Sequence, residues 1–464
     1  MIILKAIVLS LLVSILIFQI SCVPENEILS TNPNYQLIFS KDTVSFDTVF
    51  TTLGSVSKRL IVHNPHPNAV EIENVYIGKG TDSQYDITVS GKNQKVVENQ
   101  VIMGNDSLLV LVTVSIDPNE VSLPFVVRDS IVFVTNGNQQ DVKLQSWGQN
   151  AHFLGDSILA CDAQWKPDKP YYLYGSILVD SLCTLTIDKG VQIYAAFNSF
   201  VFIKGTLLAN GDSQERILFR NERLEERYEN IPGQWGGIFF LEGSKNNIIE
   251  YTDIRNVQYG LRVGTPDKDT IPDLIIRNTR IENTSVGGIL TYSSDLMAVN
   301  TLVNTSTGYN VANFAGGNYI YQHCTFANYP ISFFQESPSV IFTDNVVLEN
   351  DEIITEAINL HLYNTIVWGN LSEEIYIDTS GGSEFILRSY NSILKSSLDI
   401  FEGSGNYLST DTEFMQFQDY NNYDYTPDSL SPAIDNARKT GLSIDLFGFE
   451  RDSLPDIGAI EFLK

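Results

Sequence analysis

Four aspartates recur through the middle of the sequence at spacings that could bring them together. Asp253, Asp273, Asp295 and Asp344 follow one another after 20, 22 and 49 residues. Two carboxyl groups on either side of a glycosidic bond can hydrolyse it, one as acid and the other as base or nucleophile. Carboxylate oxygens also bind Ca²⁺, and on a strand edge they serve as solvated charges. We take Asp253, Asp295 and Asp344 as the catalytic candidates, with Ca²⁺ binding and solvation as the alternatives.

Aromatic side chains supply a second kind of candidate. Trp235 ends the charged insert at residues 220–238, and Tyr420 and Tyr423 lie in the tyrosine-rich stretch 419–429. An aromatic ring on a loop can stack against a sugar, but it can also pack onto the protein itself. Trp235, Tyr420 and Tyr423 are therefore ligand-binding candidates. The alternatives are packing onto the core for Trp235 and sealing of the fold for the two tyrosines.

Other chemistry is missing from the sequence. His323 and His361 have no histidine or cysteine at ligand spacing, so no zinc site is predicted. The sequence has no G-x-S-x-G, phosphate loop or dinucleotide fingerprint. A formal net charge of −27 repels nucleic acid and anionic bilayers. We expect no nucleic-acid partner and no cofactor, with Ca²⁺ as the one ion to test.

The N-terminus has the pattern of an export signal. Residues 1–21 place Lys5 before an apolar run too short to span a membrane comfortably. The stretch FQISC resembles a bacterial lipobox, although Gln19 stands where an aliphatic residue is expected. The resemblance implies lipidation of Cys22, with ordinary secretion as the alternative. Residues 22–34 resemble the leash of Bacteroidetes-type surface lipoproteins, which implies lipid anchoring at the outer membrane or cell surface.

Residues 35–150 alternate apolar and polar side chains at period two. About seven short runs are separated by turn clusters such as SGKN and DPNE, with no helical periodicity. Asn136-Gly137 predicts a tight hairpin, since both residues tolerate positive φ. The pattern predicts an immunoglobulin-like β-sandwich. The stretch KRLIVHNPHPNAVEIENVYI resembles bacterial modules of this kind, which usually serve as spacers.

The rest of the chain repeats. Apolar couplets begin at Leu185, Val191, Val201, Leu207 and Ile217, giving gaps of 6, 10, 6 and 10 residues. Short strands at such a period are typical of a solenoid. Longer repeats follow, in which Asn256, Asn283 and Asn328 recur after an apolar residue. Asparagine tolerates the left-handed conformation and can form stacked ladders, so it suits a corner between strands. The aligned apolar residues of these longer repeats are Ile254, Ile281, Val303, Phe326, Val347 and Ile366.

Residues 155–464 resemble the right-handed parallel β-helix of pectate-lyase-like proteins. The resemblance rests on GVQIYAAFNSFVFIKGTLLANG, PGQWGGIFF, NTIVWGN, and a closing pair SPAIDNA and PDIGAIEF, which implies a C-terminal sealing segment. Coils about 4.8 Å apart would stack residues one coil apart within reach of a disulfide. Cys161 and Cys183, 22 residues apart, therefore form a disulfide or remain two core thiols.

The resemblance gives a fold more readily than a function. Polygalacturonan hydrolases of this fold carry Asn-Thr-Asp and Gly-His-Gly motifs, and the lyases need a basic residue. Neither motif occurs here, and no Lys or Arg lies between Glu282 and Leu387. We therefore expect a non-catalytic lipoprotein that binds glycans or envelope components. A polysaccharide lyase or glycoside hydrolase is the runner-up, and a structural surface protein is the third alternative.

Overall fold

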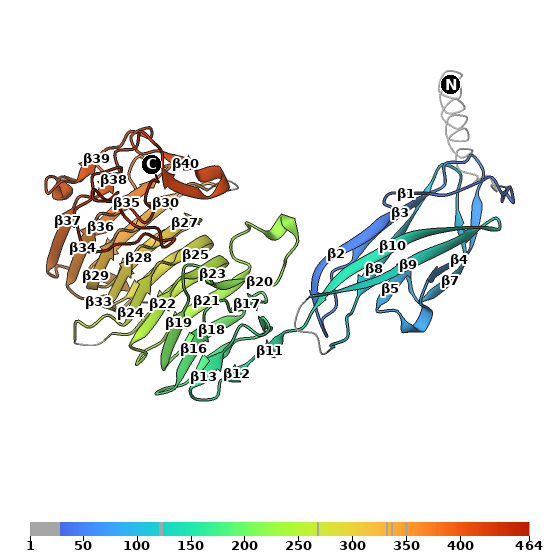
Figure 1. Cartoon of the computed structure of the whole chain (residues 1–464), viewed down its shortest axis with the longest axis horizontal. Coiled ribbons are helices and arrows are strands. Elements are labelled where there is room, and N and C mark those ends of the chain that lie inside the picture. Colours follow the sequence, from blue (N-terminus) through green and yellow to red (C-terminus); the bar gives the residue numbers. More distant parts are fainter. Residues whose placement is uncertain are drawn as a thin grey trace, which may run out of the picture. The chain divides into compact units, whose positions relative to one another are not determined.

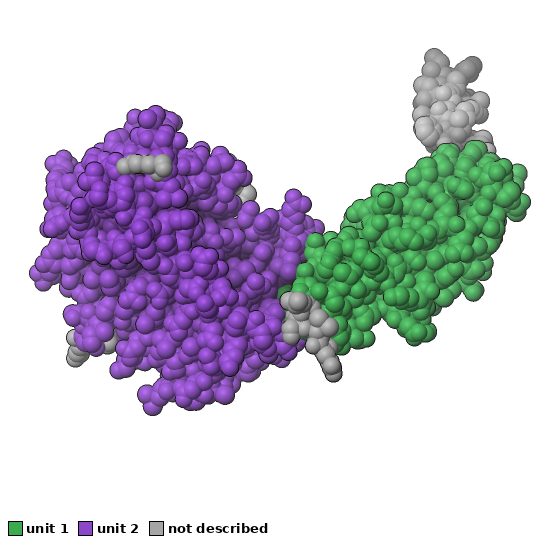
Figure 2. Space-filling model, in the orientation of Figure 1, with its two compact units in different colours: residues 1–150 green, residues 151–464 purple. Residues whose placement is uncertain are grey.

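The computed structural model of the chain describes residues 28–119, 124–266, 269–330, 333–335, 337–348 and 351–463. The chain divides into two compact units, residues 1–150 and 151–464 (Figure 2). The first unit is a β-sandwich and the second is a right-handed parallel β-helix (Figure 1). This all-β architecture confirms the fold class predicted from the sequence. The predicted signal peptide and Cys22 lie outside the described residues.

The first unit packs two five-stranded sheets over one core. The sheet orders are β1-β3-β8-β5-β6 and β2-β10-β9-β4-β7. Alternate residues of β8, Val110, Val112 and Val114, are buried, as a period of two requires. The hairpin at Asn136-Gly137 joins β9 to β10, with positive φ at both residues. The strands are β1(Ile38–Phe39), β2(Thr43–Phe50), β3(Lys58–His63), β4(Val70–Ile77), β5(Tyr85–Val89), β6(Lys92–Asn93), β7(Val96–Ile102), β8(Ser107–Val114), β9(Phe125–Thr135) and β10(Asn138–Gln149).

The second unit winds through three parallel faces, which we call faces 1, 2 and 3. Faces 1 and 2 form a continuous 18-stranded sheet because β23 and β25 run across the corner between them, and face 3 is a separate nine-stranded sheet. Face 1 consists of β11(His152–Leu154), β14(Tyr171–Leu173), β17(Gln192–Ala195), β20(Ile217–Asn221), the first parts of β23(Thr252–Val263) and β25(Arg280–Tyr292), β27(Leu302–Ser306), β30(Thr325–Asn328), β35(Ile366–Gly369), β38(Ile393–Leu394) and β39(Tyr407–Leu408).

The other two faces complete each coil. Face 2 consists of β12(Ser157–Ile158), β15(Ile177–Val179), β18(Phe200–Ile203), β21(Trp235–Phe240), the second parts of β23 and β25, β28(Tyr309–Phe314), β31(Val340–Thr343) and β36(Ile375–Asp378). Face 3 consists of β13(Ala163–Trp165), β16(Thr184–Asp188), β19(Thr206–Asn210), β22(Asn247–Glu250), β24(Leu274–Arg277), β26(Leu296–Val299), β29(Gly317–Gln322), β34(Ile358–Tyr363) and β37(Phe385–Tyr390). Two small hairpins, β32(Asn345–Val347) with β33(Ile353–Thr355) and β40(Phe417–Asp419) with β41(Asp424–Pro427), lie outside the coils.

Asparagines turn the chain at two corners. Between faces 1 and 2, Asn256 and Asn283 have positive φ, and the Asn283 side chain donates to Asn256 Oδ1 at 3.1 Å. The asparagine ladder predicted from the sequence does not continue into the coils after Asn283. Thr305 takes the next left-handed position, and Asn328 instead receives the backbone N–H of Ser306. Between faces 3 and 1, the left-handed residues are Tyr251, Asn278, Asn300, His323, Asn364 and Asn391.

The interior of the β-helix is a continuous apolar core. It includes Ile254, Ile281, Val303 and Phe326, as the repeat predicts. The last two aligned positions are wrong: Val347 is exposed in the hairpin β32–β33, and Val367 rather than Ile366 points inward. Cys161 and Cys183 form a disulfide between the first two coils, with Cα atoms 4.7 Å apart. Cys324 is a buried free thiol.

The end of the chain folds back along the side of the β-helix. We call residues 432–462 the C-terminal strap. Its backbone carbonyls accept hydrogen bonds from the corner asparagines in reverse coil order: Asn391 to Asn436, Asn364 to Arg438, Asn300 to Ile444 and Asn278 to Asp445. The sequence predicts a seal over the last coil, but the strap covers the outer surface of face 1 instead.

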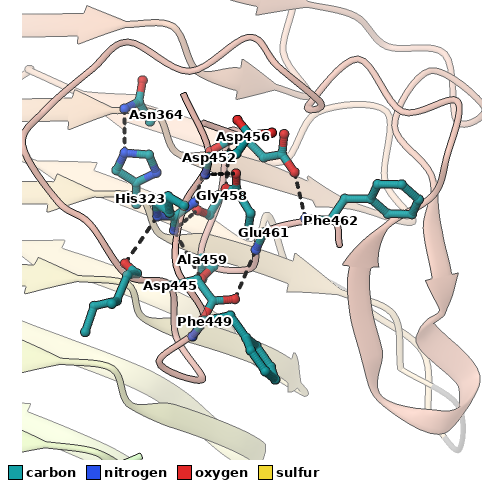
Figure 3. A network of polar contacts seen from close by, with 12 residues as sticks. His323, Asn364, Asp445, Phe449, Asp452, Asp456, Gly458, Ala459, Glu461 and Phe462 are labelled. Atoms are coloured by element: carbon teal, nitrogen blue, oxygen red, sulfur yellow. Dashed lines mark hydrogen bonds and ion pairs between the residues drawn. The ribbon is translucent and has the colours of Figure 1, made fainter. Parts of the chain in front are cut away.

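A second apolar cluster and a buried polar network hold the strap. Ile457, Ala459 and Leu446 pack on the outward side chains of face 1, including Ile366 and Trp368. Figure 3 shows the polar network, in which Glu461 receives the backbone N–H of Asp452 and donates its own to Asp445. Arg451 pairs with Glu461 at 2.9 Å, and both side chains are almost fully buried.

Candidate functional site

Asp253 is a structural residue rather than a catalytic one. It is the second residue of β23, on face 1, and receives hydrogen bonds from Arg216 Nε at 2.9 Å and Arg280 Nε at 2.8 Å. Burial on its own would raise the pKa of Asp253, but the hydrogen bonds and charges of the two arginines outweigh it, and the pKa falls below its usual value. A buried carboxylate held by two arginines is not available to a ligand.

Asp295 lies at a different corner, between faces 2 and 3. Its backbone N–H donates to Asp273 Oδ2 at 3.0 Å, and its Oδ1 receives both the backbone and the side-chain N–H groups of Asn318. Asp273 and Asp295 line a hollow of about 300 Å³ together with Glu356, Asn318 and Asn359. The structure therefore joins two of the four recurring aspartates, through contacts that the sequence spacing could not show.

Asp344 belongs to the same corner but does not line the hollow. Its carboxylate receives the backbone N–H groups of Gly381 and Ser383, each at 2.9 Å. Burial acts to raise the pKa of Asp344, and these hydrogen bonds, together with one from Asn345, lower it below its usual value. Asp344 therefore anchors a turn, and the three catalytic candidates from the sequence do not converge.

Trp235 and Tyr423 serve the fold, whereas Tyr420 is 37% exposed and its ligand role stays a prediction. Trp235 is fully buried, stacks on Phe219 and donates its indole N–H to the carbonyl of Arg255 at 2.8 Å. A ligand role for Trp235 is therefore wrong, and the alternative, packing onto the coil, is correct. Tyr423 donates to Asn283 Oδ1 at 2.9 Å, and burial raises its pKa to about 12. Tyr420 stacks on Tyr329 with ring centroids 4.3 Å apart.

A different set of aromatic residues lies on the outer surface of face 2. We call these half-exposed side chains the aromatic strip. Successive rings touch across coils: the Phe202–Phe239 centroids are 5.7 Å apart, and the Phe239–Tyr259 centroids are 5.2 Å apart. These are the distances of favourable edge-to-face pairs. The strip consists of Phe200, Phe202, Phe239, Tyr259, Tyr292 and Phe314.

Arg262 lies within the strip. Its guanidinium carbon is 5.3 Å from the ring centroid of Phe239 and 4.9 Å from that of Tyr292. Within the described ranges, no carboxylate lies at ion-pair distance from Arg262. Cation–π contacts therefore hold the Arg262 guanidinium, a hydrogen-bond donor, between the rings of Phe239 and Tyr292.

The strip leads directly to the hollow. Tyr292 ends β25 and is followed by Ser293, Ser294 and Asp295, all of which line the hollow. Phe314 ends β28 and stacks with Tyr292 at 5.3 Å. The candidate site therefore combines partly exposed rings on face 2 with acidic, amide and hydroxyl groups at its edge. The alternation FVF at 200–202 was the sequence signal that could have indicated the aromatic strip. It places two rings on the outward side of one strand, because side chains alternate between the two sides.

Comparisons with known proteins give distant structural matches alone. No protein-family model and no curated protein matches the chain. XylC, solved in complex with xylose, is 10% identical with a TM-score of 0.33, and the match covers 94% of this chain and 92% of that one. The catalytic unit of a GH87 α-1,3-glucanase from Streptomyces thermodiastaticus is 10% identical with a TM-score of 0.28, covering 72% and 73%.

A third match concerns a smaller part of the chain. The PapD-like domain 7 of human CEP192 is 9% identical with a TM-score of 0.17, covering 28% of this chain and 94% of that domain. At these identities and TM-scores the matches carry no argument about activity or ligand. The function has to be argued from the residues of face 2 and its edge.

Proposed function

We propose that this protein binds a polysaccharide along face 2 without cleaving it. The observation that carries the proposal is the aromatic strip, which presents rings from successive coils beside a polar hollow. Apolar side chains gathered at the surface beside a few polar groups are typical of a ligand-binding site. A sugar ring has apolar C–H faces and hydroxyl edges, so rings and polar groups side by side match both of its parts.

The charges favour a neutral glycan. Three acidic side chains, Asp273, Asp295 and Glu356, line the hollow, and the whole chain carries a net charge of −27. Such a field disfavours uronates and sulfated sugars. Hydroxyl groups, in contrast, can donate to carboxylates and exchange hydrogen bonds with the amides of Asn318 and Asn359.

Binding rather than hydrolysis follows from the way the carboxylates are held. Asp273 Oδ2 receives the backbone N–H of Asp295, and Asp295 Oδ1 receives two N–H groups from Asn318. These hydrogen bonds fix the corner between faces 2 and 3. A hydrolase needs a protonated acid as well as a carboxylate that both reach the glycosidic bond, whereas the carboxylates of Asp273 and Asp295 are engaged within the corner.

The proposal includes attachment of the protein to the cell envelope. Lipidation of Cys22 would hold the chain at the outer membrane or cell surface, where polysaccharides are abundant. In the part of the chain that the structure describes, no helix has the length and apolarity needed to cross a membrane. A lipid and one additional interaction give more stable anchoring than a single acyl chain, and glycan binding would supply that interaction.

A polysaccharide panel tests the proposal. The purified protein is incubated with neutral and acidic polysaccharides, with and without Ca²⁺, and both binding and new reducing or unsaturated ends are measured. We expect binding to a neutral polysaccharide and no new ends. The double variant Phe202→Ala/Phe239→Ala should weaken binding at least about tenfold, since two neighbouring rings of the strip are lost.

The control variant is Phe197→Ala. This ring is exposed at a turn outside the strip, so its removal should leave binding unchanged. If the strip variant binds the polysaccharide with the same affinity as the parent protein, face 2 is not the binding surface. New chain ends would replace the proposal with the hydrolase or lyase alternative.

A further inference from the structure

Face 3 carries an apolar column of its own. The register pairs Leu208 with Ile248, Ile248 with Ile275, Ile275 with Met297 and Met297 with Ile320. These five side chains point away from the core and are half-exposed. None of them belongs to the four hydrophobic clusters found in the described part of the chain. We call this column the aliphatic ladder.

Two opposite charges lie beside the ladder. Glu250 and Arg277 are neighbours in adjacent coils, each two residues beyond a ladder residue. Both are half-exposed. Neither forms an ion pair with any residue in the described ranges. The face therefore offers one positive and one negative group at the same position along two successive strands.

We propose that face 3 binds a second copy of this chain around a two-fold axis. The axis runs parallel to the strands and passes between Ile248 and Ile275. Rotation about it reverses the order of the coils and keeps the position along each strand. Ile248 then faces Ile275 of the second copy, and Glu250 faces Arg277 of the second copy. Both contacts occur twice, as an isologous interface requires.

The charge pattern favours a second copy of this chain as the partner of face 3. A two-fold partner needs a surface that is complementary to itself, and Glu250 beside Arg277 satisfies that condition. Branched aliphatic side chains offer no flat ring to a sugar, in contrast to the aromatic strip on face 2. The outer surface of face 1 is already covered over its C-terminal half by the C-terminal strap. Face 3 thus differs from face 2 in chemistry and from the covered half of face 1 in exposure.

The dimensions predict a weak dimer. The axis brings four ladder coils of each copy into contact, Leu208 to Met297, and coils about 4.8 Å apart with strands of four to five residues give a contact of about 19 Å by about 15 Å. Two sheets pack face to face at a separation of about 10 Å. The contact is below the roughly 800 Å² per partner of a standard stable complex. The dimer should therefore form in the micromolar range and depend on concentration.

Analytical ultracentrifugation of the purified protein tests the interface. Measurements from about 1 to about 200 µM cover the affinity expected of a small interface. We expect the parent protein to shift from monomer to dimer across this range. Ile275→Asp should stay monomeric, because it buries a charge at the centre of the contact. Leu430→Asp, at an exposed aliphatic residue outside face 3, should dimerise like the parent.

A charge swap gives the decisive result. Glu250→Arg alone and Arg277→Glu alone should each be monomeric, since like charges would meet twice. A mixture of the two variants should form a heterodimer. In the mixed pair, the arginine introduced at position 250 of one copy faces the glutamate introduced at position 277 of the other. The unchanged Arg277 of the first copy then faces the unchanged Glu250 of the second, so both contacts join opposite charges. An ion pair within one chain cannot produce that recovery. Circular dichroism of each variant confirms folding. A parent protein that is monomeric at every concentration, or a mixture that does not pair, overturns the proposal.

Discussion

The side-chain amide of Asn278 donates a hydrogen bond to the backbone carbonyl of Asp445 at 2.6 Å, although the two residues lie 167 positions apart. Asn278 turns the chain between faces 3 and 1 with a φ of 49°. One residue type thus performs two tasks: it accepts the left-handed conformation, and it binds the C-terminal strap. The corner asparagines form a row of donors along the β-helix, and the strap supplies the matching carbonyls.

Asn300→Ala should destabilise the protein by about 3 kcal/mol. The change removes the hydrogen bond to Ile444, removes one of the acceptors of Arg451 Nη2 and strains the left-handed position. Asn300→Gly loses the same hydrogen bonds without the strain, so it should cost about 1 kcal/mol less. Urea unfolding measures both. Equal stability of Asn300→Ala and the parent protein would show that the strap does not depend on this corner.

Strap stability should fall as pH rises from about 4 to about 6. Burial raises the pKa of Asp456 to about 6, and the nearby carboxylates of Glu461 and Asp435 act in the same direction. The folded state therefore holds a proton that the unfolded chain has released at these pH values. The loss is on the order of 2 kcal/mol. Urea unfolding at several pH values measures it, and Asp456→Asn should flatten the slope within this window.

Reduction of the disulfide should loosen the first coils. Cys161 and Cys183 close a loop with a sequence separation of 22, for which loop entropy gives about 3 kcal/mol. The double variant Cys161→Ser/Cys183→Ser should match the reduced parent protein in thermal unfolding. Reductant should not change the double variant, because Cys324 is buried and unpaired. Proteolysis near residue 165 should increase in the reduced form, and an unchanged digestion pattern would count against a stabilising role.

Gly237→Ala should prevent correct folding of the fourth coil or cost more than about 3 kcal/mol. Gly237 has a φ of 138°, and an added Cβ would lie 1.9 Å from the carbonyl oxygen of Tyr259. The same glycine lies at the register shift between β21 and β23. Gly243→Ala is the matched control, since its φ is also positive but no atom lies within 4 Å of the added Cβ. Similar melting temperatures for the two variants would refute the steric argument.

Local patterns in the sequence account for the coils. Strand alternation and the recurring Ile254, Ile281, Val303 and Phe326 predict the inward residues, because each strand must bury every second side chain. At the C-terminal end of the repeat, the pattern does not determine which residue points inward. Ile366 and Val367 are both apolar, so nothing local decides which one points inward, and the structure selects Val367.

The sequence by itself indicated a β-sandwich followed by a solenoid of short strands, since alternation, corner asparagines and repeat length are local properties, and the resemblance to pectate-lyase-like proteins predicted a β-helix. Only the tertiary structure decided which outward residues are available. Trp368 on face 1 and Phe239 on face 2 both point away from the core, but a segment distant in the chain covers Trp368 and leaves Phe239 half-exposed. Coverage depends on contacts between residues far apart in the chain, which neither period nor spacing encodes. For this reason, the sequence patterns did not identify the aromatic strip on face 2 as a candidate site.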